Sequence, residues 1–199
     1  MDPPTLILAS ASPRRRELLA AVYPTFVVQP CELAEPQRRS ERVLPAQWAQ
    51  ALAYFKARAV AERLPGAWVL GADTLVSCGG RVLGKPRDLA DARDMLELQA
   101  RQVSEVLTGL CLLRTGPAAC RHCGVDRTRV WMRDDPAERE AYLAGGDWRG
   151  KAWAYGIQNI GDRLVERIEG SFSNVVGLPL ERLAQLLRVA GLPVPVARV

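Results

Sequence analysis

The stretch AWVLGADTLV (residues 67–76) decides the fold class, because it is a nearly continuous apolar run with one aspartate inside it. Runs of this kind are strands covered on both faces, which is typical of a sheet with helices on either side. Shorter apolar runs alternate with helical spacing before and after it. The sequence therefore predicts an α/β protein with a mixed, twisted sheet, flanking helices and a single domain over residues 1–199.

The remaining elements follow from periodicity and from turn residues. We expect strands at residues 5–9, 26–28, 81–83, 103–113, 125–132 and 164–168, and helices at residues 13–22, 47–63, 88–99, 136–145 and 179–190. Ser12 suits the N-cap of the first helix, and Pro13 occupies the favoured first helical position. Residues 150–158 are too polar and rich in glycine for a core strand, so we expect a loop there.

The composition of the 199-residue chain narrows the function classes. Lys and Arg number 27 against 22 Asp and Glu, a formal net charge of +5 that is dispersed along the chain except at residues 14–16. A dispersed excess favours a solvated surface over a nucleic-acid face. No apolar stretch reaches the ~20 residues that a spanning helix needs, and five scattered cysteines fit reduced thiols. We expect a cytoplasmic protein with no nucleic-acid or membrane partner.

Asp73 is the first candidate functional residue. Burying its carboxylate in an apolar strand is costly unless a cation, a metal ion or hydrogen-bond donors meet it. It could be a simple turn former at a strand end, but Leu75 and Val76 continue the apolar run, which favours a functional acid. The candidate counter-charges are Arg14, Arg15, Lys56 and Lys85.

The segment SASPRR (residues 10–15) places cations in the first turn of a helix, where they oppose the positive end of the helix dipole. An anionic ligand would remove that conflict. Backbone N–H groups, the hydroxyls of Ser10 and Ser12 and an arginine fork could together form a phosphate cradle. Taken alone, the three arginines could equally lie on the surface, and neither a P-loop nor a dinucleotide fingerprint is present.

Three other features carry weaker signals. Glu32 and Glu35, in a polar loop, could ligate Mg²⁺ together with substrate phosphates, or could be solvated acids. Gln158 could read the edge of a base with its amide, or could be a loop glutamine in water. The pair Cys120 and Cys123 has the two-residue spacing of one half of a zinc site, but no second knuckle accompanies it, so we interpret this segment as a hairpin tip.

Five segments in this order resemble the Maf family of nucleoside triphosphate pyrophosphatases. They are SASPRR (10–15), GADT (71–74), LGKPRD (83–88), GKAWAYGIQ (150–158) and EGSFSNVVGLPLE (169–181). The resemblance implies an α/β fold of two lobes around a central cleft, similar to inosine triphosphate pyrophosphatases, and a homodimer. It also implies hydrolysis of a nucleoside triphosphate to the monophosphate and pyrophosphate with a divalent cation, Mg²⁺ or Mn²⁺.

The resemblance also implies roles for individual residues. Asp73 matches the acid that serves as general base. Positions linked to substrate choice match Arg14, Thr74 and Gln158, and the polar and cationic lining of the cleft matches Ser10, Ser12, Arg15, Lys56 and Lys85. The AYGIQ form (154–158) is similar to the branch that acts on dTTP and UTP. At two positions this chain differs from that branch. Trp153 stands where the branch usually has a glycine, and Asn159 stands where another glycine is common.

These observations predict a pyrophosphatase acting on dTTP or UTP, and possibly on modified nucleotides. Two alternatives stay open: a non-catalytic nucleotide-binding regulator of cell division, and a protein that binds nucleic acid through its basic surface.

Overall fold

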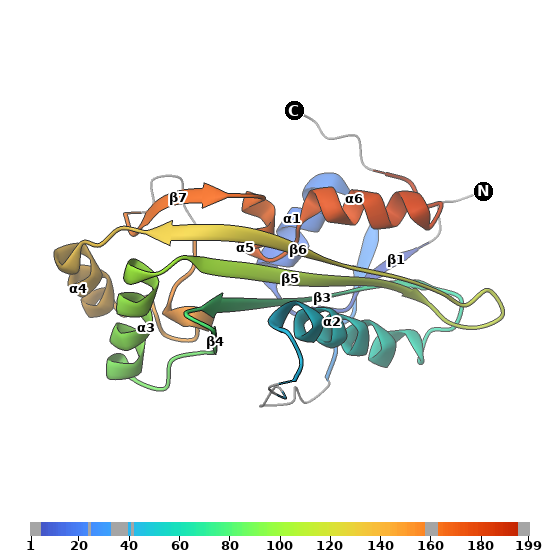
Figure 1. Cartoon of the computed structure of the whole chain (residues 1–199). Helices are drawn as coiled ribbons and strands as arrows, with labels where there is room; N and C mark the ends of the chain where they lie inside the picture. The colour runs from blue at the N-terminus through green and yellow to red at the C-terminus, as the bar shows by residue number, and fades with distance from the viewer. Residues whose placement is uncertain (1–4, 24, 33–39, 41, 158–162, 195–199) are drawn as a thin grey trace. The chain divides into compact units, whose positions relative to one another are not determined.

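The computed structural model describes residues 5–23, 25–32, 40, 42–157 and 163–194 (Figure 1). Its strands are β1 (Leu6–Leu8), β2 (Phe26–Val28), β3 (Trp68–Cys78), β4 (Arg81–Leu83), β5 (Ser104–Arg114), β6 (Cys120–Met132) and β7 (Val165–Glu169). Its helices are α1 (Pro13–Val22), α2 (Pro45–Ala61), α3 (Leu89–Arg101), α4 (Pro136–Gly145), the 3₁₀ turn η1 (Ala152–Ala154), α5 (Phe172–Val176) and α6 (Leu180–Val189).

The seven strands form one mixed sheet in the order β2-β1-β3-β5-β6-β7, with β4 paired to β3. Strand β1 runs parallel to both β2 and β3, whereas the pairs β3 with β4 and β6 with β7 are antiparallel. The predicted α/β class and mixed sheet are therefore confirmed.

The chain divides into two compact units. Unit 1 comprises residues 1–74, 108–126 and 177–199, and unit 2 comprises residues 75–107 and 127–176.

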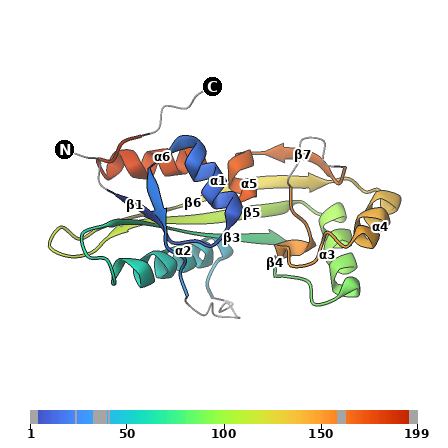
Figure 2. The same cartoon turned by 180° about the vertical axis from the view of Figure 1, so that it is seen from behind.

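Unit 1 has three layers. Helices α1 and α6 lie side by side on one face of its strands, and α2 lies on the other face (Figures 1 and 2). The side chains of β1 alternate accordingly: Leu6 and Leu8 pack with α1 and α6, while Ile7 packs with α2. Because both faces are covered, these strands are apolar throughout, as their sequence indicates.

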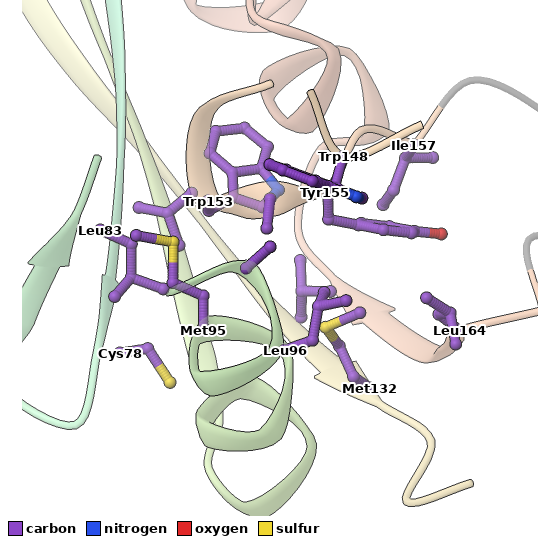
Figure 3. Close-up of a cluster of buried hydrophobic side chains, with 14 of the residues drawn as sticks. Cys78, Leu83, Met95, Leu96, Met132, Trp148, Trp153, Tyr155, Ile157 and Leu164 are labelled. Atoms are coloured by element: carbon purple, nitrogen blue, oxygen red, sulfur yellow. The ribbon is translucent and has the colours of Figure 1, made fainter. Parts of the chain in front are cut away.

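Unit 2 has its own hydrophobic core, which α3, α4 and the segment around η1 share with the ends of the long strands. Figure 3 shows Met95 and Leu96 of α3 facing the rings of Trp153 and Tyr155. Trp153 and Ala154 both have positive φ, at 52° and 59°, a conformation that favours glycine. The buried Gln99 side chain donates to the Trp153 carbonyl at 3.0 Å and supports this turn.

The structure refines one sequence interpretation and corrects another. Residues 151–157 form no strand, as expected, but Trp153, Tyr155 and Ile157 line the core of unit 2 because the turn at η1 buries them under α3. Cys120 and Cys123 lie within β6, not at a hairpin tip, since this strand begins five residues earlier than expected. Their side chains pack against opposite faces of unit 1, so the two sulfur atoms cannot share one metal ion.

Candidate active site

Helix α2 lies unusually close to the sheet, and two glycines make this approach possible. A Cβ atom at Gly71 of β3 would lie 2.7 Å from the backbone nitrogen of Ala57, and one at Gly109 of β5 would lie 2.6 Å from the backbone nitrogen of Gln50. Ala53 and Ala57 of α2, on the side of the helix that faces the sheet, are completely buried. Small residues on both partners thus bring the α2 backbone onto the strands.

This close packing places Lys56 of α2 beside Asp73 of β3. Asp73 lies two residues after Gly71, so its side chain points to the same face of the strand. The Lys56 Nζ atom lies 2.6 Å from Oδ1 of Asp73, and only 15% and 8% of the two side chains are exposed. Among the described residues, Asp73 carries the only carboxylate that is buried. The Lys56 ammonium therefore compensates a charge that burial alone would make very costly.

Thr74 points to the other face of β3, where Arg15 meets it. Arg15 donates from Nη2 to Oγ1 of Thr74 at 3.0 Å, from Nη1 to Oγ of Ser10 at 3.3 Å and from Nε to the carbonyl of Gly177 at 2.9 Å. The hydroxyl of Thr74 also lies 3.0 Å from that of Thr108 on β5. Arg15 thus directs three N–H groups at the protein itself and joins α1, β3 and the turn before α6.

The start of α1 is built as the sequence predicts. The Ser12 side chain accepts a hydrogen bond from the Arg15 backbone at 3.5 Å, and Pro13 is the first helical residue. Arg14 and Arg15 are half-buried, whereas Arg16 is exposed. The first turn of α1 contains no acidic residue, so the positive end of the helix dipole and the Arg14 charge add up at this corner. This corner can bind an anion.

Unit 1 therefore brings together seven of the predicted residues, on two faces of the same stretch of β3: Ser10, Ser12, Arg14, Arg15, Lys56, Asp73 and Thr74. Lys85 belongs to unit 2, where it follows β4 and is exposed. Glu32 is exposed in unit 1. Glu35, Gln158 and Asn159 lie outside the described residues.

Sequence reasoning missed the residues that support this site. Thr108 is completely buried and contacts Thr74, yet a threonine in an apolar strand carries no distinctive signal. Gly177 has φ +120°, and its carbonyl accepts from Arg15. The glycine of the GADT segment was a visible signal, since an isolated glycine within a strand often marks a close approach of another backbone.

A family profile described as Maf-like protein matches residues 5–190. The chain belongs to the Maf family. A protein of Moorella thermoacetica named dTTP/UTP pyrophosphatase is 48% identical over 192 residues, covering 95% of this chain and 96% of that protein. Proteins of the same name are 44% identical in Anaeromyxobacter dehalogenans strain 2CP-1, covering 96% of this chain and 97% of that protein, and 43% identical in Deinococcus radiodurans, covering 94% of each.

Among solved structures, a dITP/XTP pyrophosphatase of Mycobacterium abscessus is 14% identical with a TM-score of 0.46, covering 94% of this chain and 97% of that chain.

Proposed function

We propose that this Maf protein hydrolyses dTTP and UTP to the nucleoside monophosphate and pyrophosphate. The supporting observations within the chain are the buried Asp73 carboxylate, held 2.6 Å from Lys56, and a helix start rich in cations in the same unit. The relatives named dTTP/UTP pyrophosphatase match nearly the whole chain, which supports the same reaction class.

In this proposal the triphosphate binds at the start of α1. The backbone N–H groups of the first turn and the Arg14 guanidinium neutralise phosphate charge, and the Ser10 and Ser12 hydroxyls add hydrogen bonds. Arg15 holds Ser10 and Thr74 in place through the contacts described above. For Lys85, the proposed role in binding phosphate rests on the family resemblance alone.

Asp73 is the proposed general base. Its carboxylate takes a proton from a water molecule whose oxygen attacks the α-phosphorus, and the bridging oxygen leaves with pyrophosphate. Lys56 stabilises the carboxylate charge before the transfer and orients the group through their hydrogen bond. Arg14, Thr74 and Gln158 are the proposed determinants of nucleotide choice.

A divalent cation such as Mg²⁺ fits this chemistry. Mg²⁺ prefers oxygen ligands and is often held by one or two carboxylates together with substrate phosphates. Asp73 offers such a carboxylate in the same unit as the α1 start, whereas Glu32, the other described acid in the prediction, is exposed. When bound, the cation would neutralise charge on the phosphates. Asp73 is therefore our proposed principal protein ligand, with Glu32 and Glu35 as weaker candidates.

Exchange of one carboxylate tests the proposal. Asp73→Asn should abolish pyrophosphate release from dTTP and UTP in the presence of Mg²⁺, while Asp94→Asn, at an exposed site on α3, should turn over normally. Products are separated as pyrophosphate and orthophosphate. Orthophosphate as the main product of the unmodified protein would contradict the cleavage position. Nucleotide that stays bound and intact with Mg²⁺ would instead support the non-catalytic regulator.

We further propose a cytoplasmic homodimer made of one Maf-like domain over residues 1–199, as the family resemblance implies. In the part of the chain that the structure describes, no helix is both long and apolar enough to cross a membrane. Light scattering at several protein concentrations tests the oligomeric state.

A further inference from the structure

Two thiols of unit 1 face each other across the hairpin of β5 and β6. The sulfur atoms of Cys111 on β5 and Cys123 on β6 lie 2.8 Å apart. Cys111 is completely buried, and Cys123 is half-buried at the edge of the same hydrophobic cluster under α2. Neither thiol takes part in the proposed hydrolysis, so their arrangement is an independent feature of the chain.

We propose that Cys111 and Cys123 form a reversible disulfide when the protein meets a hydroperoxide. The sulfur atoms need to approach by only about 0.8 Å to reach the ~2.05 Å of a disulfide. Opposing residues on neighbouring antiparallel strands have Cα atoms about 4.5–5.5 Å apart, within the span that a disulfide bridges. The hairpin backbone therefore needs little rearrangement.

Cys123 is the thiol that reacts first. It is the more accessible of the two, and its hydrogen-bonded contact with Cys111 lowers the pKa of Cys123, with a smaller contribution from the charge of Arg121. The same hydrogen bond and burial raise the pKa of Cys111. Because the thiolate is the nucleophile, Cys123 attacks the peroxide and Cys111 resolves the product.

The oxidation proceeds in two steps. The Cys123 thiolate attacks one peroxide oxygen, the O–O bond breaks, and Cys123 becomes a sulfenic acid while hydroxide leaves and takes up a proton as water. The Cys111 sulfur then attacks the sulfenic sulfur, the S–O bond breaks, and a second water carries away the oxygen with the Cys111 proton. Two thiols are oxidised by two electrons and one hydrogen peroxide is reduced. An added dithiol reverses the change.

The other cysteines provide the controls. Cys120 lies on the same strand but on the opposite face, where its sulfur is 3.1 Å from Nε2 of His122. Cys78 lies in the core of unit 2, and burial raises its pKa. Cys31 packs against the same cluster as Cys123 and is the one described competitor on that face.

The disulfide should also stabilise unit 1, because it restricts the unfolded chain. It closes a short loop through the β5 to β6 turn, next to Ala53 and Ala57 of α2. We expect the melting temperature of the oxidised protein to rise by a few degrees, roughly 5 °C, relative to the reduced protein. Cys123→Ala should lack this rise.

The test treats the full chain with a small excess of hydrogen peroxide, blocks remaining thiols with an alkylating agent and maps the peptides. We expect loss of two alkylation sites, a peptide pair joining Cys111 to Cys123, a mass decrease of about 2 Da before alkylation, and full reversal by dithiothreitol. Cys120→Ala should behave like the unmodified chain, and Cys123→Ala should form no such bond. A bond from Cys123 to Cys31, bonds only between chains, or a stable Cys123 sulfinic acid would overturn the proposal.

Discussion

Replacing Gly71 by alanine tests how α2 positions Lys56. The new Cβ would lie 2.7 Å from the Ala57 nitrogen, 0.7 Å short of the 3.4 Å at which ordinary contact begins. It would also meet the Ala53 carbonyl oxygen still more closely. Both atoms belong to the helix backbone, so no side-chain rotation relieves the clash. Helix α2 must therefore retreat by at least 0.7 Å.

That retreat has two measurable consequences. Overpacking at such a site costs about 1–3 kcal/mol, which lowers the melting temperature by roughly 2–4 °C per kcal/mol. The distance from Lys56 Nζ to Asp73 Oδ1 would lengthen from 2.6 Å to about 3.3 Å, beyond the range of a charge-assisted hydrogen bond. Since misplacement by about 1 Å can reduce turnover ~100-fold, we expect Gly71→Ala to lose about 10- to 100-fold in kcat.

The assays are thermal unfolding and pyrophosphate release from dTTP. Gly145→Ala is the matched control, because no atom lies within 4 Å of its Cβ position and its φ is not positive. Gly145 is the last residue of α4, so its replacement by alanine should leave the stability unchanged or raise it slightly. Wild-type stability together with wild-type turnover in Gly71→Ala would refute the argument that this glycine sets the position of the helix.

Three further substitutions have defined outcomes. Lys56→Met leaves the buried Asp73 carboxylate without its ammonium partner, so chemical denaturation should report a loss of about 3–5 kcal/mol; an unchanged midpoint would show that the pair is not buried in solution. Trp153→Gly relieves a positive φ worth about 1–2 kcal/mol but removes a buried indole worth about 3–5 kcal/mol, so net destabilisation is expected, and a rise in melting temperature would contradict this balance. The Arg87 hydrogen bond holds the pKa of Asp91 below its ordinary value, so this carboxylate stabilises the fold above its unfolded pKa and loses that effect as pH falls. Asp91→Asn should therefore lower the melting temperature at pH 7 but differ little from wild type near pH 2; a pH-independent difference would argue against the ion pair.

Much of the fold could be predicted from local patterns. The apolar run of β3 predicted a strand covered on both faces, and Leu8 and Ile7 show that both faces of the sheet are packed. Ser12 and Pro13 predicted the start of α1 because capping depends on hydrogen bonds within three residues. Asp73 stood out as a charge inside an apolar strand, and its buried partner Lys56 was among the candidate cations. These features depend on burial and on neighbours in sequence.

Other features depend on contacts between distant parts of the chain. Arg15 meets Gly177 across 162 positions, and no local pattern shows that its guanidinium is directed at the protein. Cys111 and Cys123 are partners because β6 begins before Cys123 and so includes it. The sequence pattern placed the start of this strand after Cys123, so the pair was missed. Trp153 enters a core only because Gln99 supports a left-handed turn beneath α3.

The sequence alone thus determined the α/β class, the helix start rich in cations and the buried acid, because propensity, capping and the cost of burying charge act locally. Only the tertiary structure decided that Gly71 admits α2, that Asp73 and Thr74 face opposite sides of β3, and that Arg15 serves as an internal clamp. Those outcomes depend on side-chain volume and hydrogen bonding between elements, which become defined only when the layers pack.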